Sequence, residues 1–162
     1  MRAALAAATL LVATPAIAGD DTPQNSVTFS PIHLLMPVVE VNYERSLTDL
    51  HAVALMGGRG SISNYSVTEV GLQYRAYVLG DFGTGLGVGA EGVALRIDTA
   101  GVVGTGYSGG PMLTGKATAG FGLTGVLDIG YQFVKASATD GDQSASQSGG
   151  SVLLNLNLGW SF

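Results

Sequence analysis

Three charged residues stand where their side chains could form a buried ion-pair cluster: Arg75, Glu91 and Lys116. Each lies in the polar phase of a segment in which apolar and polar residues alternate, and the three segments follow one another along the chain. If these segments are neighbouring strands of a barrel, the three side chains can meet in its interior. A carboxylate between two cations offsets the desolvation cost that none of them could meet alone. We therefore expect these residues to form a structural cluster in the lumen. The alternative is that they line a path for protons or ions, together with Glu69.

Three other cations, Arg59, Arg96 and Lys135, fall at the far ends of predicted strands. Their phase is outward, although a bulge at Gly92 would turn Arg96 inward. Long basic side chains at such positions anchor a protein at a membrane interface. They also suit the binding of phosphate groups, so contact with lipopolysaccharide is the sharper hypothesis.

Catalytic residues are not predicted. Lipid hydrolysis by a serine nucleophile needs a histidine base and an orienting acid close by. The chain has two histidines: His33, with Ser30 three residues before it, and His51, which has no adjacent acid. The His and carboxylate residues lack metal-ligand spacing and there is no cysteine, so we expect no metal and no cofactor.

Eight strand-like segments must position these side chains. Each approaches the ~9–11 residues with which a tilted strand crosses a bilayer. They are Ser26–Leu34, Val38–Leu47, His51–Gly60, Ser66–Leu79, Gly85–Ile97, Pro111–Leu123, Val126–Lys135 and Val152–Phe162. Tight turns, including Thr124–Gly125, alternate with longer polar connections, of which Ala138–Gly150 is the longest. The pattern predicts an all-β, eight-stranded, antiparallel, up-and-down transmembrane β-barrel with short periplasmic turns and longer extracellular loops.

The distribution of charge favours a membrane barrel over a soluble one. All 12 acidic residues fall in the polar phase, in the leader, or in turns and loops. The last strand alternates apolar residues with Asn and Ser and ends on Phe162. Tyr43, Phe121 and Trp160 gather with Phe162 near the short turns, where an interfacial aromatic girdle would lie.

The start of the chain is predicted to be an export signal. Residues 1–18 combine Arg2, an apolar run and the small-residue cleavage site Ala16-Ile17-Ala18. Residues 19–25 then form a short periplasmic leader, and residues 26–162 form the barrel domain. Only 12% of the residues are charged, and the net charge of −5 argues against binding of nucleic acid.

The export signal, the eight strands and the ending Leu158-Gly159-Trp160-Ser161-Phe162 resemble the small outer-membrane β-barrel families of Gram-negative bacteria, such as OmpX and the transmembrane domain of OmpA. The terminal pattern is similar to the signal that hands such proteins to the barrel-assembly machinery, although Gly159 stands nearer the end than usual. The resemblance implies a monomer in the outer membrane, in contact with lipid and lipopolysaccharide.

The resemblance does not supply an activity. An eight-stranded barrel is just wide enough for side chains to fill it, so we expect a closed polar lumen. The expected role is structural or one of surface interaction. A narrow or gated channel for protons or small ions is the alternative, and a lipid-modifying outer-membrane enzyme is the third.

Overall fold

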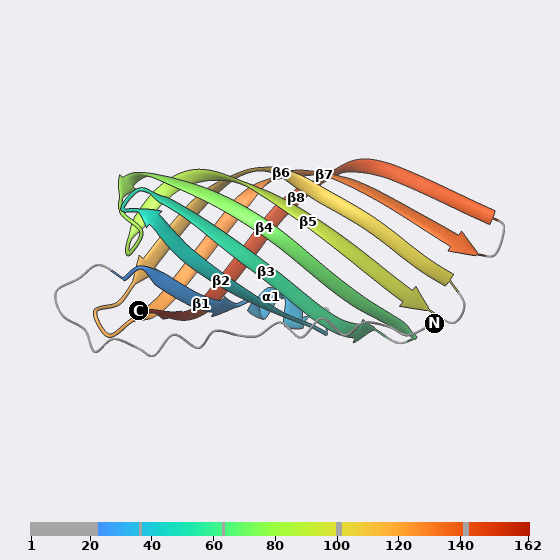
Figure 1. The fold of residues 1–162 in the computed structure, drawn as a ribbon, viewed down its shortest axis with the longest axis horizontal. Coiled ribbons are helices and arrows are strands. Elements are labelled where there is room, and N and C mark those ends of the chain that lie inside the picture. The colour runs from blue at the N-terminus through green and yellow to red at the C-terminus, as the bar shows by residue number, and fades with distance from the viewer. Residues whose placement is uncertain (1–22, 36, 63, 100–101, 141–142) are drawn as a thin grey trace.

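Eight antiparallel strands form a closed barrel in which each strand pairs with the next along the chain and β8 pairs with β1 (Figure 1). The computed structural model describes residues 23–35, 37–62, 64–99, 102–140 and 143–162. Its elements are β1 (Asn25–Phe29), α1 (Pro31–Leu34), β2 (Val38–Thr48), β3 (His51–Ile62), β4 (Tyr65–Gly80), β5 (Gly85–Thr99), β6 (Val102–Thr118), β7 (Leu123–Asp140) and β8 (Gln143–Ser161). The prediction of an all-β, eight-stranded, up-and-down barrel is confirmed. The predicted export signal, residues 1–18, lies outside the described residues.

None of the helices among the described residues is long and apolar enough to cross a membrane.

Short turns gather at one end of the barrel, together with the start of β1 and the end of β8. The backbone N–H groups of Gln24 and Asn25 donate to the carbonyl of Phe162, which ties the two ends together. The predicted turn at Thr124–Gly125 is wrong, because both residues pair within β7 and the turn precedes them. Gly122 makes that turn possible: its φ of 98° is a conformation that residues with a Cβ rarely adopt.

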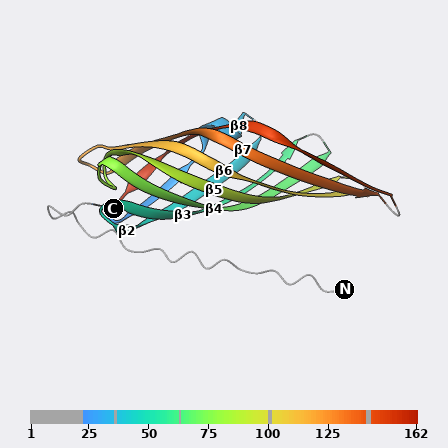
Figure 2. The ribbon, with the colours of Figure 1, turned by 90° about the horizontal axis from the view of Figure 1, so that it is seen from above.

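The opposite end differs from the prediction. Ala138–Gly150 is not a long loop: β7 and β8 stay paired out to Asp140 and Gln143. The Ser, Gly and Gln residues of this stretch have weak strand propensity, which hides the strands from a reading of the sequence. The strands form nevertheless, because backbone hydrogen bonds do not need apolar side chains. As a result, the β7–β8 hairpin projects well beyond β2 and β3 (Figures 1 and 2).

The first predicted strand is wrong beyond Phe29. Ser30 remains extended, and Pro31 then starts α1, since proline has no N–H for the sheet and suits the first turn of a helix. The pairing of β1 with β8 is therefore short, from Ser26↔Ser161 to Phe29↔Leu158. Above it, α1 lies against β2 and β8.

The two faces of the barrel carry opposite chemistry. The outer face is apolar: Leu72 is 61% exposed, Phe133 68% and Val152 70%. The interior is polar, and among its side chains Glu40, Gln73 and Asp128 are fully buried. This distribution confirms the predicted inward and outward phases. A soluble barrel would show the reverse.

Candidate functional site

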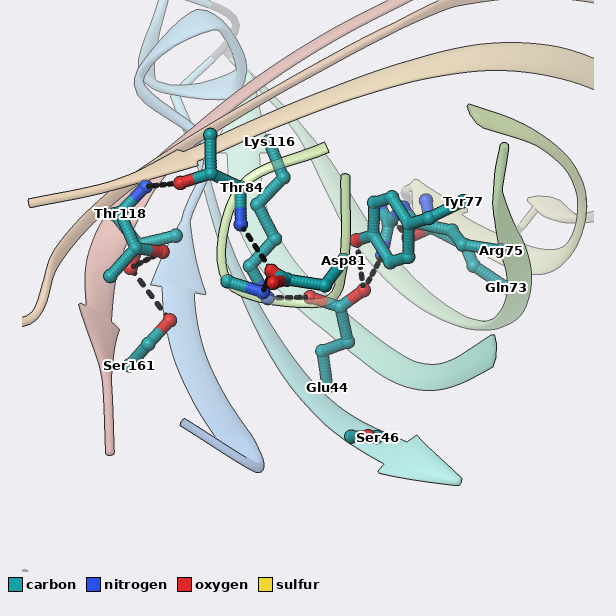
Figure 3. Close-up of polar contacts among 12 residues, drawn as sticks. Glu44, Ser46, Gln73, Arg75, Tyr77, Asp81, Thr84, Lys116, Thr118 and Ser161 are labelled. Carbon is teal, nitrogen blue, oxygen red and sulfur yellow. Dashed lines mark hydrogen bonds and ion pairs between the residues drawn. The ribbon is translucent and has the colours of Figure 1, made fainter. Parts of the chain in front are cut away.

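The barrel interior holds a buried network that we call the arginine cluster: Arg75, Glu44, Asp128 and Lys116. One guanidinium nitrogen of Arg75 lies 3.0 Å from Glu44 Oε1, and the other lies 2.8 Å from Asp128 Oδ2. Lys116 Nζ donates to the second oxygen of Glu44 at 2.7 Å. Their side chains are at most 3% exposed. Figure 3 shows Arg75 and Tyr77 from β4 and Lys116 from β6 converging on Glu44.

Aromatic side chains close the barrel below this cluster. Phe82, from the turn between β4 and β5, is fully buried, and Lys116 Nζ lies 3.4 Å from the centre of its ring. Tyr77 packs edge-on against Phe82 and donates its hydroxyl to Glu44. Cations are attracted to the face of such a ring. The short-turn end of the barrel is therefore filled by side chains in mutual contact.

Glu91 is not the carboxylate that joins the two cations. The structure brings together Arg75 and Lys116, as predicted, but Glu44 lies between them, and Glu91 accepts a hydrogen bond from Gln73 Nε2 at 2.7 Å. The stagger of the strands is the reason. Glu91 pairs with Gly110, six residues before Lys116 on β6, so the two lie ~20 Å apart along the strand direction.

Charge is balanced in the arginine cluster and unbalanced above it. Two cations face two carboxylates in that cluster, whereas Glu40, Glu69 and Glu91 lie farther from the short turns. Along β2, Glu40 precedes Glu44, and along β4, Glu69 precedes Arg75, in each case on the side away from those turns. Among the described residues, His33 is the one basic group in an ion pair with any of these three glutamates.

His33, Glu40 and Glu69 form a second group, which we call the histidine cluster. One ligand atom from each lies within 4.8 Å of the other two. His33 Nδ1 lies 2.5 Å from Glu40 Oε2, with side-chain exposures of 21% and 0%. The contact with Glu40 raises the pKa of His33 above its ordinary value, and partial burial of the ring opposes that rise. This set of donors could hold a metal ion.

Sequence spacing missed the histidine cluster because its members lie on three different elements. Glu40 on β2 pairs with Gly58 on β3, and Gly58 pairs with Glu69 on β4. The two glutamates therefore share one row of the sheet, separated by a residue without a side chain. His33 reaches them from α1, where the sequence predicts a strand. Two acids in register around a glycine were the available signal.

The rim cations Arg59, Arg96 and Lys135 all lie exposed on the outer face, as their phase predicts. The register runs without a shift past Gly92, so there is no bulge there and Arg96 stays outward. Arg59 and Arg96 share one row of the sheet, with Thr68 between them. Arg96 is paired with Asp98 at 2.8 Å, which neutralises part of this basic surface. Contact with lipopolysaccharide stays a prediction.

His33 and His51 contact side chains other than serine. Ser30 Oγ donates to Asn155 Oδ1 at 3.1 Å. His51 Nδ1 lies 2.7 Å from the Tyr74 hydroxyl on an exposed surface. Across the described part of the chain, no serine hydroxyl is hydrogen-bonded to a histidine.

Comparison of the chain with protein-family models, with curated proteins and with solved structures finds no match.

Proposed function

We propose that this chain is a small outer-membrane β-barrel protein, of the OmpX-like and OmpA-like kind, with a closed polar lumen and a structural or surface-interaction role. One observation carries the proposal: the apolar face of the barrel points out and the charged face points in. A transmembrane barrel needs this distribution because lipid surrounds it and water does not.

The size of the apolar surface supports a membrane location. Large apolar side chains are exposed on every strand of the barrel: examples are Phe29, Val41, Leu55, Leu72, Val88, Leu113, Ile129 and Leu154. A soluble monomer rarely exposes one continuous apolar patch beyond a few hundred Å². Tyr43 and Trp160 are exposed near the short turns, where an aromatic girdle would meet the headgroups.

The arginine cluster and Phe82 support a closed lumen. An ion would have to displace a network whose charged groups are already paired with one another, at the end where Phe82 fills the barrel. We therefore favour the structural role over the narrow channel. A channel would give discrete current steps in planar bilayers, and we expect the purified barrel to give none.

The projecting β7–β8 hairpin supports the surface-interaction role. Its residues 145–152 are exposed in both phases, and serine, glycine and glutamine prevail among them. Between Gln143 and Asn157, the edge of β8 that faces β1 has no strand partner among the described residues. At the other end, the terminal strand to Phe162 is the segment that we expect the barrel-assembly machinery to bind.

Membrane fractionation tests the proposal. The protein should stay with outer membranes after a carbonate wash, because its apolar belt is embedded in lipid. Its unboiled and boiled forms should migrate differently on a denaturing gel, since a barrel resists detergent until heated. Recovery as a soluble periplasmic species would contradict the membrane assignment.

A further inference from the structure

The histidine cluster contains three buried polar atoms that have no hydrogen-bond partner outside the cluster. They are His33 Nδ1, Glu40 Oε2 and Glu69 Oε1, one on each member of the cluster. Glu40 is fully buried, and its Oε2 lies 2.5 Å from His33 Nδ1, which forms an ion pair when the ring is protonated. A buried polar atom without a partner is costly, so when His33 is neutral and both glutamates are ionised these three atoms call for one common partner.

We propose that His33, Glu40 and Glu69 bind a divalent transition-metal ion, with Zn²⁺ as the ion of reference. One imidazole nitrogen and two carboxylate oxygens suit Zn²⁺ and similar divalent transition-metal ions, whereas Ca²⁺ and Mg²⁺ favour sites built from oxygen alone. Three protein ligands leave at least one coordination position for water. The His33 side chain is 21% exposed, so the cluster lies next to solvent.

A bound dication would balance the charge of the histidine cluster. Two carboxylates face each other across Gly58, and the cations of the arginine cluster are already matched by Glu44 and Asp128. A protonated His33 would leave one negative charge in excess. A dication bound by neutral His33 and both glutamates leaves none.

The surroundings of the cluster are built to orient its ligands. Asn42 Nδ2 donates to Glu40 Oε1 at 2.9 Å and to Asn157 Oδ1 at 3.1 Å. Glu40 is thereby held with its other oxygen, Oε2, toward His33, as a supporting hydrogen bond orients a ligand in known metal sites. On β3, Gly58 leaves room for the carboxyl group of Glu69, because a Cβ at this position would meet that group directly.

Zinc titration of the protein, purified without an affinity tag and treated with a chelator, tests the proposal. We expect one Zn²⁺ per chain. His33→Ala and Glu69→Gln should each weaken binding by ~10-fold or more, given that even supporting residues matter by this amount. The matched control is His51→Ala, because it removes the other histidine, which lies at the opposite end of β3 from Gly58. This control should bind as the parent does.

A second pair of variants tests the geometry without deleting a ligand. Gly58→Ala should weaken zinc binding by pushing the Glu69 carboxyl group aside, whereas Gly57→Ala, one residue away on the outer face, should not. Each variant is first checked for heat-modifiable migration, so that loss of the fold is seen separately. Binding that is absent in the parent, or that survives both Glu69→Gln and Gly58→Ala in folded protein, would overturn the proposal.

Discussion

The two charged clusters of the lumen solve the problem of buried charge in opposite ways. In the arginine cluster, cations and carboxylates are equal in number, and Glu44 uses both oxygens, one toward Arg75 and one toward Lys116. In the histidine cluster, carboxylates outnumber the base, and each member keeps a buried atom with no hydrogen-bond partner outside the cluster. Complete pairing suits a structural plug, whereas incomplete pairing suits a site that receives a ligand.

The two clusters also lie at different heights in the barrel. The arginine cluster lies with Phe82 and Tyr77 near the short turns, where the barrel closes fully. The histidine cluster lies beside α1, where β1 has left the sheet and the seam between β1 and β8 has ended. The balanced cluster thus lies at the end where the barrel closes, and the cluster with an excess of carboxylates lies where the pairing of β1 with β8 has ended.

Breaking the arginine cluster should have the largest effect. Glu44→Gln leaves Arg75 and Lys116 with Asp128 as their one remaining carboxylate in the cluster, which should lower the free energy of unfolding by ~3–5 kcal/mol. Denaturant titration in lipid vesicles measures it. The control is Glu91→Gln, which keeps a hydrogen-bonding side chain beside Gln73 and should cost about 1 kcal/mol. Equal losses in the two variants would refute the role of Glu44.

Adding Lys116→Met to Glu44→Gln sharpens the same comparison. The second change removes one stranded cation, so the double variant should recover part of the stability lost in Glu44→Gln. Contacting residues give non-additive changes of ~0.5–3 kcal/mol in such a cycle. Strictly additive losses would show that the pair is not coupled.

Charge placed on the outer face should depend on depth. Leu154 is 53% exposed along the middle of β8, and Leu79 is 65% exposed next to a short turn. Leu154→Arg should cost ~2–4 kcal/mol in vesicles, because the charge enters the hydrocarbon, whereas Leu79→Arg should cost ~0–1 kcal/mol near the interface. The same cost at both positions would argue against a lipid belt around the barrel.

Zinc should stabilise the parent and leave the histidine variant unchanged. At a free concentration of 100 times its Kd, Zn²⁺ should add about 2.7 kcal/mol to the free energy of unfolding. His33→Ala should show no such gain at the same concentration. An equal gain in both proteins would place the bound zinc elsewhere.

The sequence carries the fold because period-two alternation and apolar strands are local signals. It places Leu72, Gln73 and Arg75 on the correct faces, and it identifies Arg75 and Lys116 as members of one cluster. It could not select Glu44 over Glu91, because that choice depends on the stagger between strands, which no single segment encodes. It missed α1, because a proline such as Pro31 ends a strand only where the neighbouring strand requires an N–H donor at that position, which the sequence does not reveal.

The histidine cluster was the hardest to foresee. Its members come from α1, β2 and β4, and their approach depends on Gly58 in the strand between the glutamates. The extended β7–β8 hairpin was hidden for another reason: its small polar residues carry the composition of a loop while their backbones pair as strands.

Stability of Glu44→Gln and Glu69→Gln, each measured with and without Zn²⁺, tests the division of the lumen most directly. We predict that Glu44→Gln is strongly destabilised in both conditions and still gains stability from zinc. Metal-free Glu69→Gln should unfold within about 1 kcal/mol of the parent, because it removes one of two repelling carboxylates, and it should gain nothing from zinc. A large loss in metal-free Glu69→Gln, or an undiminished zinc response, would contradict the division into a structural plug and a ligand site.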